Sequence, residues 1–211
     1  MKKFKKLIIA CDGEAASGKS TAARLISRRY KLILINSGLL YRYASKLIIK
    51  NKPKDNSSFL KKKFSKISYN RIARLNLHSE QISNHVAVLS KDKNIRKIIN
   101  NFQKKLIRKN KKICVEGRDI ASKILAKRPK YDLAFYFKCS IKVASYRRWL
   151  DIKKKISLKG VRKSLSKRTS MDKKRKNSPL IKVKDAILIR TDKLNKKQVL
   201  NKMSKYIDKL N

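Results

Sequence analysis

The sequence predicts an α/β fold, a three-layer α/β/α sandwich with a five-stranded parallel sheet. Short apolar runs alternate with longer segments of helical spacing, which is the pattern of parallel strands joined by covering helices. Four of the five glycines follow such apolar runs, and strand ends are where an open α/β sheet binds ligands. These glycines are Gly13, Gly18, Gly38 and Gly117.

The individual elements follow from two patterns. The run Leu7-Ile8-Ile9-Ala10-Cys11 is typical of a buried strand because it is short and continuously apolar. Residues 21–26 have the spacing of an amphipathic helix. By the same patterns the predicted strands are 6–12, 32–35, 112–116, 132–137 and 186–190. The predicted helices are 18–29, 38–50, 79–90, 92–109, 118–126, 140–155, 158–170 and 195–209.

We expect a single domain over residues 1–211, since this length suits one core. The core would comprise residues 1–50, 79–146 and 179–211. A polar, lysine-rich segment at about 51–78 would form a short insertion that closes over a substrate. The basic segment at about 147–178 would form a lid.

The loop after the first strand has the sequence Gly13-Glu14-Ala15-Ala16-Ser17-Gly18-Lys19-Ser20, which matches the pattern G-x-x-x-x-G-K-[ST] and is followed by Thr21. In such a P-loop the backbone N–H groups cradle a polyphosphate, the lysine adds a charge, and the serine hydroxyl binds Mg²⁺. A glycine turn with an incidental lysine is the alternative. The preceding strand and following helix favour a site for a nucleoside triphosphate.

The formal net charge of +47 is extreme. A basic surface for nucleic acid is one interpretation. However, the lysines are spread over the whole chain, which favours the compositional bias of an AT-rich genome. The three cysteines are expected to be reduced core thiols. No apolar run is long enough for a membrane span, and the N-terminus lacks the pattern of a signal peptide, so we expect a cytoplasmic protein.

Arginine is informative because lysine is the common cation of this chain. A guanidinium binds a phosphate through two parallel hydrogen bonds, which an ammonium cannot do. Several arginines lie in polar segments after predicted strands or on predicted helices. We expect Arg168, Asp172 and Arg175 to share one helix face because they are spaced i, i+4, i+7. The other segments are Asn36–Arg42, Glu116–Asp119 and Arg147-Arg148.

These motifs, in this order, resemble the bacterial cytidylate kinases of the nucleoside monophosphate (NMP) kinase group. The loop at 13–21, the segment Asn36–Arg42, and Glu116-Gly117-Arg118-Asp119-Ile120 are similar to motifs of that family. So is the series Arg168, Asp172 and Arg175 that runs into Pro179-Leu180. The resemblance spans nearly the whole chain and identifies 51–78 with a shortened NMP-binding insertion.

The resemblance assigns a role to each matching residue. Gly13, Glu14, Ala15, Ala16, Ser17, Gly18, Lys19, Ser20 and Thr21 would bind ATP, with Ser20 as the Mg²⁺ ligand. Ser37, Tyr41, Arg42, Arg96, Arg118, Asp119, Arg168, Asp172 and Arg175 would bind CMP. Lys19, Arg118, Arg147, Arg148 and Arg175 would promote transfer of the phosphoryl group.

The chain also departs from the family pattern. Glu14 replaces a usual proline, and its carboxylate is expected to point to solvent or bind metal and so to weaken ATP binding. Ala16 replaces a usual glycine. The other departures are Asn36 for aspartate, His78 for arginine, Ala87 for a base-reading serine, and Arg190 for aspartate.

The function expected from these residues is transfer of the γ-phosphoryl group of ATP to CMP or dCMP, with Mg²⁺, by a monomer that acts on small molecules. Nucleic acid would bind only non-specifically, and membranes not at all. One alternative is another small P-loop kinase, for UMP, AMP, shikimate or dephospho-coenzyme A. The other is a basic nucleic-acid-binding protein with a degenerate P-loop.

Overall fold

The computed structural model describes residues 4–210. The N-terminal residues 1–3, on which the expectation of no signal peptide partly rests, lie outside the described part. The chain divides into two compact units, one of residues 1–35 with 110–211 and one of residues 36–109. The predicted boundaries of core, insertion and lid stay predictions.

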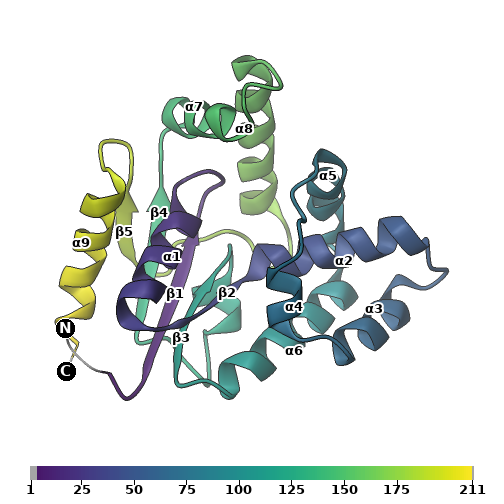
Figure 1. The fold of residues 1–211 in the computed structure, drawn as a ribbon, viewed down its shortest axis with the longest axis horizontal. Coiled ribbons are helices and arrows are strands. Elements are labelled where there is room, and N and C mark those ends of the chain that lie inside the picture. Colours follow the sequence, from purple (N-terminus) through teal and green to yellow (C-terminus); the bar gives the residue numbers. More distant parts are fainter. Residues whose placement is uncertain (1–3, 211) are drawn as a thin grey trace. The chain divides into compact units, whose positions relative to one another are not determined.

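The first unit is built on a parallel sheet with the strand order β2-β3-β1-β4-β5 (Figure 1). The central strand β1 pairs in parallel with β3 and β4, and β4 pairs in parallel with β5. All five predicted strands are confirmed, and their ends differ from the predicted ones by one residue at most. The bounds are β1 Leu7–Gly13, β2 Ile33–Asn36, β3 Lys112–Glu116, β4 Leu133–Lys138 and β5 Ile187–Arg190.

Both faces of this sheet are buried. Leu7, Ile9 and Cys11 of β1 pack on one face in a cluster with α1 (Lys19–Tyr30) and α9 (Lys196–Ile207). The alternate side chains of β1 point to the opposite face, as the two-residue period of a strand requires, and they are buried as well. The predicted α/β P-loop architecture is therefore confirmed.

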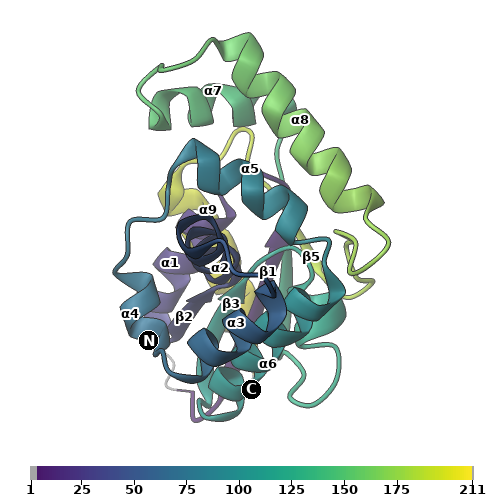
Figure 2. The same cartoon turned by 90° about the vertical axis from the view of Figure 1, so that its right-hand side faces the viewer.

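The helix predicted at 118–126 is wrong: a single π-helical turn, Ile120–Ile124, lies there instead. Helices α7 (Ile141–Asp151) and α8 (Leu158–Lys174) pack against each other as a hairpin (Figure 2). The first of them ends four residues before the predicted 155, because Lys153 and Lys154 adopt left-handed backbone conformations with φ of 53° and 57°.

The second unit consists of helices in the described structure. Three of them, α2, α5 and α6, match the predicted helices. The segment 51–78 holds two helices that were not predicted. In α3 only Leu60 and Phe64 are buried, and α4 has five residues, so neither gives a clear helical period. The bounds are α2 Ser37–Asn51, α3 Asn56–Ser65, α4 Tyr69–Ala73, α5 Glu80–Leu89 and α6 Lys93–Arg108.

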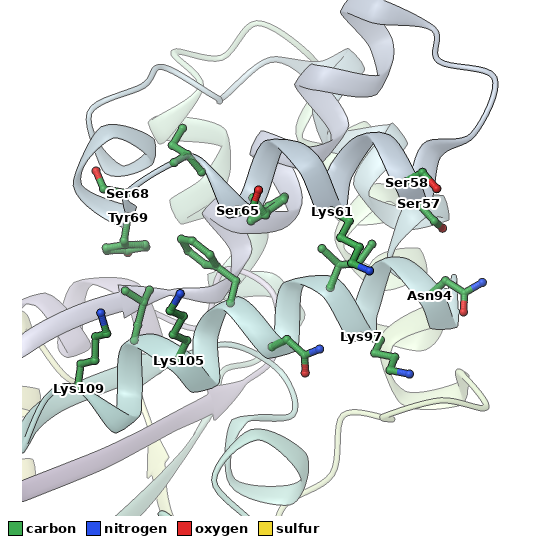
Figure 3. A pocket seen from close by; sticks show the side chains of 16 residues that line it. Ser57, Ser58, Lys61, Ser65, Ser68, Tyr69, Asn94, Lys97, Lys105 and Lys109 are labelled. Carbon is green, nitrogen blue, oxygen red and sulfur yellow. The ribbon is translucent and has the colours of Figure 1, made fainter.

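A groove of about 730 Å³ runs between α3 and α6 in this unit (Figure 3). Its floor includes the apolar side chains of Phe64 and Phe102, which meet edge to face. Lysines from both helices line it: Lys61, Lys97, Lys105 and Lys109. None of the residues predicted to bind CMP is among the lining residues.

Two predictions from composition concern the core. Cys11, Cys114 and Cys139 are all free and buried, which confirms the prediction of reduced core thiols. Among residues 4–210 no helix is long and apolar enough to cross a membrane.

Candidate active site

The P-loop leaves β1 at Gly13, where only glycine fits. Its φ is 154°, and a Cβ atom there would lie 2.4 Å from the carbonyl oxygen of Phe137 on the neighbouring strand. Gly18, with φ of 80°, begins α1. Between them the Ser17 hydroxyl donates to the Glu14 carbonyl at 2.9 Å. The loop is thus a fixed turn between strand and helix, as the motif predicts.

Helix α1 differs from the other described α-helices at its N-terminus. Each helix from α2 to α9 begins at a Ser, Asp or Asn whose side chain accepts a hydrogen bond from a backbone N–H of the first turn. Helix α1 begins at Gly18, which has no side chain for this purpose. Its first N–H groups are therefore available for an anion, and the helix dipole favours negative charge there.

Lys19 lies in the first turn of α1 and is buried, 6 % exposed. Its Nζ lies 3.4 Å from Oε2 of Glu116, which is also buried at the end of β3. Burial, and next the nearby Arg118 guanidinium, lower the pKa of Lys19, whereas Glu116 opposes this shift. An ammonium held in this way presents a directed charge to the loop.

Asp12 precedes the P-loop on β1 and is 3 % exposed. Its carboxylate accepts hydrogen bonds from the backbone N–H groups of Ile120 and Ala121, at 2.9 and 2.8 Å. Burial raises the pKa of Asp12 to about 6, although these two hydrogen bonds act in the opposite direction. The π-helical turn after β3 is therefore fixed to the end of β1.

We expected the Glu14 carboxylate to point to solvent or to bind a metal; the first alternative is wrong, and the second stays a prediction. The Glu14 side chain is 12 % exposed, and its Oε1 lies 2.7 Å from Nζ of Lys173 in the last turn of α8. Ala15 packs against Ala144, Val161 and Leu165 of the α7–α8 hairpin. Ala16, where the family usually has glycine, adopts a φ of 55°. The hairpin thus rests on the P-loop.

Four predicted substrate residues of the first unit form one cluster of charges. Nε of Arg118 donates to Oδ2 of Asp172 at 3.0 Å, and Arg175 lies 3.5 Å from Oδ1 of the same carboxylate. Arg175 also lies 3.8 Å from Asp119. The structure therefore brings together two guanidinium groups and two carboxylates from separate segments.

The prediction that Arg168, Asp172 and Arg175 share one helix face is wrong for Arg175. Helix α8 extends to Lys174, and Arg175 follows it with an extended backbone, ψ of 136°. Its guanidinium nevertheless turns back to Asp172. Arg168 is half-buried on α8, and Arg148 is half-buried on α7.

Beside the P-loop lies a pocket of about 600 Å³, lined by Thr21 and Leu25 of α1 and by Leu194 and Val199. A pocket of this size and lining suits the base of a nucleotide whose phosphates lie in the loop. Arg147 also lines it. In this structure the Arg147 guanidinium donates to the hydroxyl and carbonyl oxygens of Thr191, at 3.1 and 2.7 Å.

The remaining predicted substrate residues lie in the second unit. Ser37 and Tyr41 are buried on α2. Arg42 donates to the Leu77 carbonyl and to the Ser83 hydroxyl, both at 3.0 Å. Arg96 is buried on α6 with its guanidinium 5.6 Å from the centre of the Tyr41 ring.

Four departures from the family pattern have clear positions. Asn36 caps α2, because its Oδ1 accepts from the Leu39 N–H at 3.2 Å, which an aspartate would also do. Ala87 is half-buried on α5. His78 and Arg190 are exposed, the latter at the end of β5.

From the sequence no individual role was assigned to four residues of the site: Asp12, Glu116, Lys173 and Thr191. Three of them lie at or directly after strands β1, β3 and β5. The rule that ligands bind at the carboxyl ends of parallel strands could have identified these three. Lys173 had no signal, because it is one of many lysines in its segment.

A parallel sheet with a P-loop, a buried loop lysine and a cluster of arginines defines a P-loop nucleotide-binding protein. Among the described residues no group of three or more His, Cys, Asp or Glu could hold a metal ion by itself. The sequence model of the cytidylate kinase family matches residues 9–209. The chain therefore belongs to the cytidylate kinase family.

Curated relatives agree with this assignment. A cytidylate kinase of Fusobacterium nucleatum is 29 % identical, with 97 % of this chain and 98 % of the relative covered. A bifunctional pantoate ligase/cytidylate kinase of Prochlorococcus marinus strain AS9601 is 34 % identical over 96 % of this chain. The chain spans 43 % of the length of that bifunctional relative.

Solved structures support the fold. An uncharacterised protein of Eubacterium ventriosum has a TM-score of 0.59 at 20 % identity, over 97 % of this chain and 99 % of its own. A shikimate kinase of Bacteroides thetaiotaomicron has a TM-score of 0.51 at 8 % identity, over 96 % of this chain and 98 % of its own. At such identities the likeness concerns the fold alone.

Proposed function

We propose that this chain transfers the γ-phosphoryl group of ATP to CMP or dCMP, giving ADP and CDP or dCDP. The observation that supports this most is found in the first unit, where a P-loop with buried Lys19 occurs together with the charge cluster of Arg118, Asp119, Asp172 and Arg175. Phosphoryl transfer between two anionic substrates requires such positioned positive charges.

On the donor side, residues 13–21 would hold the triphosphate through backbone N–H groups, and Lys19 would stabilise charge on the β- and γ-phosphates. The pocket lined by Leu25 and Leu194 would take the adenine ring. This arrangement leaves the γ-phosphate at the mouth of the loop, where an acceptor can approach.

The residues at the start of α1 also suit Mg²⁺. The Ser20 side chain is exposed in the first turn, beside N–H groups that have no side-chain cap. Its hydroxyl would be the protein ligand of a Mg²⁺ ion carried with ATP. When bound, the ion neutralises charge on the β- and γ-phosphate oxygens.

On the acceptor side, Arg42 and Arg118 would hold the phosphate of CMP, whereas Arg168, Asp172 and Arg175 would contact its ribose or phosphate. Ser37 and Tyr41 complete this set. An oxygen of the CMP phosphate forms the new bond to the γ-phosphorus while the bond to the bridging oxygen breaks, and ADP leaves with that electron pair. The nucleophile is already an anion, so no strong general base is required.

Arg147 and Arg148 of α7 would act as lid arginines over the transferring group. Arg147 is bonded to Thr191 in this structure. For this role its guanidinium would exchange those protein oxygens for phosphate oxygens, a substitution that strengthens its hydrogen bonds.

Asp119 and Arg96 would read the base. The Asp119 carboxylate accepts from the amino group of cytosine, and Arg96 donates to the ring nitrogen and carbonyl. UMP would place a carbonyl against Asp119, which is unfavourable because two hydrogen-bond acceptors would face each other. Ala87 lacks the hydroxyl that would add a further contact, so selectivity against UMP is expected to be modest.

The test is an assay of ADP release with CMP, dCMP, UMP and AMP as acceptors in the presence of ATP and Mg²⁺. We expect the highest kcat/KM for CMP and dCMP. Equal kcat/KM values for CMP and UMP, or a preference for AMP, would refute CMP as the acceptor but would still be consistent with a kinase.

The net charge of +47 favours nucleic-acid binding as a second candidate function. Binding by charge alone falls steeply with salt, because counterions are released. We therefore expect oligonucleotide binding to be non-specific, with an affinity that falls steeply as salt rises, while nucleotide turnover continues at physiological salt. Salt-resistant, sequence-dependent binding would favour the second candidate. The monomeric state and the cytoplasmic location stay predictions.

A further inference from the structure

Three carboxylates lie in or next to the P-loop, where they would repel a triphosphate. Two are compensated within the sheet region: Asp12 accepts two backbone N–H groups, and Glu116 lies against Lys19. The third, Glu14, belongs to the loop itself. Its compensation comes from the α7–α8 hairpin, through Lys173.

The backbone of Glu14 is fixed within the P-loop. The Glu14 N–H donates to the Phe137 carbonyl at 3.1 Å, and its own carbonyl accepts from the Ser17 hydroxyl at 2.9 Å. The backbone is thus held on both sides, and the side chain is mostly buried. Without a partner, its charge would remain beside the phosphates at an effective dielectric well below that of water.

Lys173 is well placed to cancel this charge. It follows Asp172, which the two arginines of the charge cluster hold, and it lies at the end of a helix whose core contacts include Ala15. The lysine side chain is about half exposed, at 47 %. An ion pair of that exposure contributes little to folding stability, so its effect should be found in binding.

We propose that Lys173 is a positioning residue of the donor site, which neutralises the Glu14 carboxylate and holds it aside so that the P-loop accepts the triphosphate. This inference rests on the proposed binding of ATP, but not on the identity of the acceptor. It explains how a loop with glutamate at this position remains suited to a polyanion.

The experiment measures the dissociation constant of Mg²⁺-ATP by calorimetry without acceptor, and kcat and KM with CMP. For Lys173→Met we expect the Kd and KM for ATP to rise about ten-fold, with kcat and the KM for CMP within about two-fold. Lys173→Arg should retain the ATP affinity of the original protein because arginine keeps the positive charge. Lys174→Met, one residue further on the same helix, is the control and should leave ATP binding unchanged.

The decisive variant is the double substitution Glu14→Gln with Lys173→Met. If Lys173 acts by neutralising Glu14, removal of both charges returns the Kd for ATP to within about two-fold of the original protein. If the double variant binds ATP as poorly as Lys173→Met, the lysine acts on the phosphates directly and the inference is wrong. An unchanged Kd in Lys173→Met overturns it as well.

These outcomes are separate from those of the proposed function. A protein that binds ATP with the expected dependence on Lys173 but does not phosphorylate CMP would refute the acceptor alone. A protein with normal CMP kinase activity and no effect of Lys173→Met on ATP binding would refute this inference alone.

Discussion

The two units of the molecule treat charge differently. In the first unit several charged side chains are buried at the ends of β1 and β3 or in the loop and helix turn that follow them: Asp12, Lys19, Glu116 and Asp119. Among the described residues of the second unit, Arg96 is the one charged residue that is buried. The lysines of the α3–α6 groove are exposed.

This difference separates function from composition. A buried charge is costly unless it is paired or hydrogen-bonded, so four of them near the carboxyl ends of β1 and β3 indicate a site for charged ligands. Exposed lysines have almost no such desolvation cost, so a chain with this composition can accumulate them on its surface. The positions of buried charge, and not the net charge, therefore locate the candidate chemistry.

The largest effect is expected at Lys19. Its substitution by alanine removes the buried cation that would stabilise charge on the transferring phosphoryl group, and we expect kcat to fall by at least about 10³-fold. Calorimetry should show CMP binding largely unchanged. Lys202→Ala, an exposed change on α9, is the matched control. Near-normal turnover of Lys19→Ala would show that the buried charges of the first unit do not mark the catalytic site.

The second effect concerns the pH dependence of stability. Because the pKa of Asp12 is about 6 in the folded protein and near the ordinary aspartate value of 3.8 in the unfolded chain, the folded state binds this proton more tightly. The stabilisation that Asp12 contributes to the folded state is thus fully present below about pH 4 and is lost as the pH rises through 6. The free energy of unfolding changes by a value on the order of 3 kcal/mol over this range.

Urea unfolding of the original protein and of Asp12→Asn, each at about pH 4.5 and pH 7.5, measures this. The original protein should lose more stability over this interval than the variant, because asparagine does not titrate. The comparison between pH values cancels the altered hydrogen bonds of the variant. Equal losses would show that this buried carboxylate has an ordinary pKa.

A smaller effect compares the two units directly. Arg118→Lys in the first and Arg42→Lys in the second each keep the charge but lose the planar guanidinium. We expect each to raise the KM for CMP by about ten- to fifty-fold, with a smaller effect on the KM for ATP. If only Arg118→Lys does so, the acceptor phosphate is bound by the first unit alone.

The smallest effect is expected in the loop at Ala16. A left-handed φ of 55° costs alanine about 1 kcal/mol, and glycine avoids this cost but has greater freedom in the unfolded chain. Ala16→Gly should therefore change the free energy of unfolding by at most about 0.5 kcal/mol, in the stabilising direction. Ala15→Gly, a buried position in the same loop, should destabilise the fold, because it loses the methyl that packs on the hairpin.

The sequence predicted the first unit better than the second for a physical reason. Buried parallel strands give continuous apolar runs, and the P-loop motif fixes its own backbone geometry, so both were visible. Helix α3 buries two side chains and therefore has little periodicity. The ion pair of Glu14 with Lys173 joins residues that are far apart in the chain. Because lysine is common throughout the sequence, no local pattern could predict which lysine pairs with Glu14.

Thr191 joins two parts of the first unit, the P-loop and helix α7, by hydrogen bonds. Its hydroxyl donates to the Ser17 carbonyl of the P-loop and accepts from Arg147 of α7, directly after β5 ends. Thr191 thus connects the P-loop, the end of β5 and helix α7 through hydrogen bonds. Amide hydrogens of the P-loop and of α7 should therefore exchange with solvent as one cooperative unit. Binding of a nucleotide in the loop should therefore slow amide exchange along the whole of α7 as well as in the loop itself.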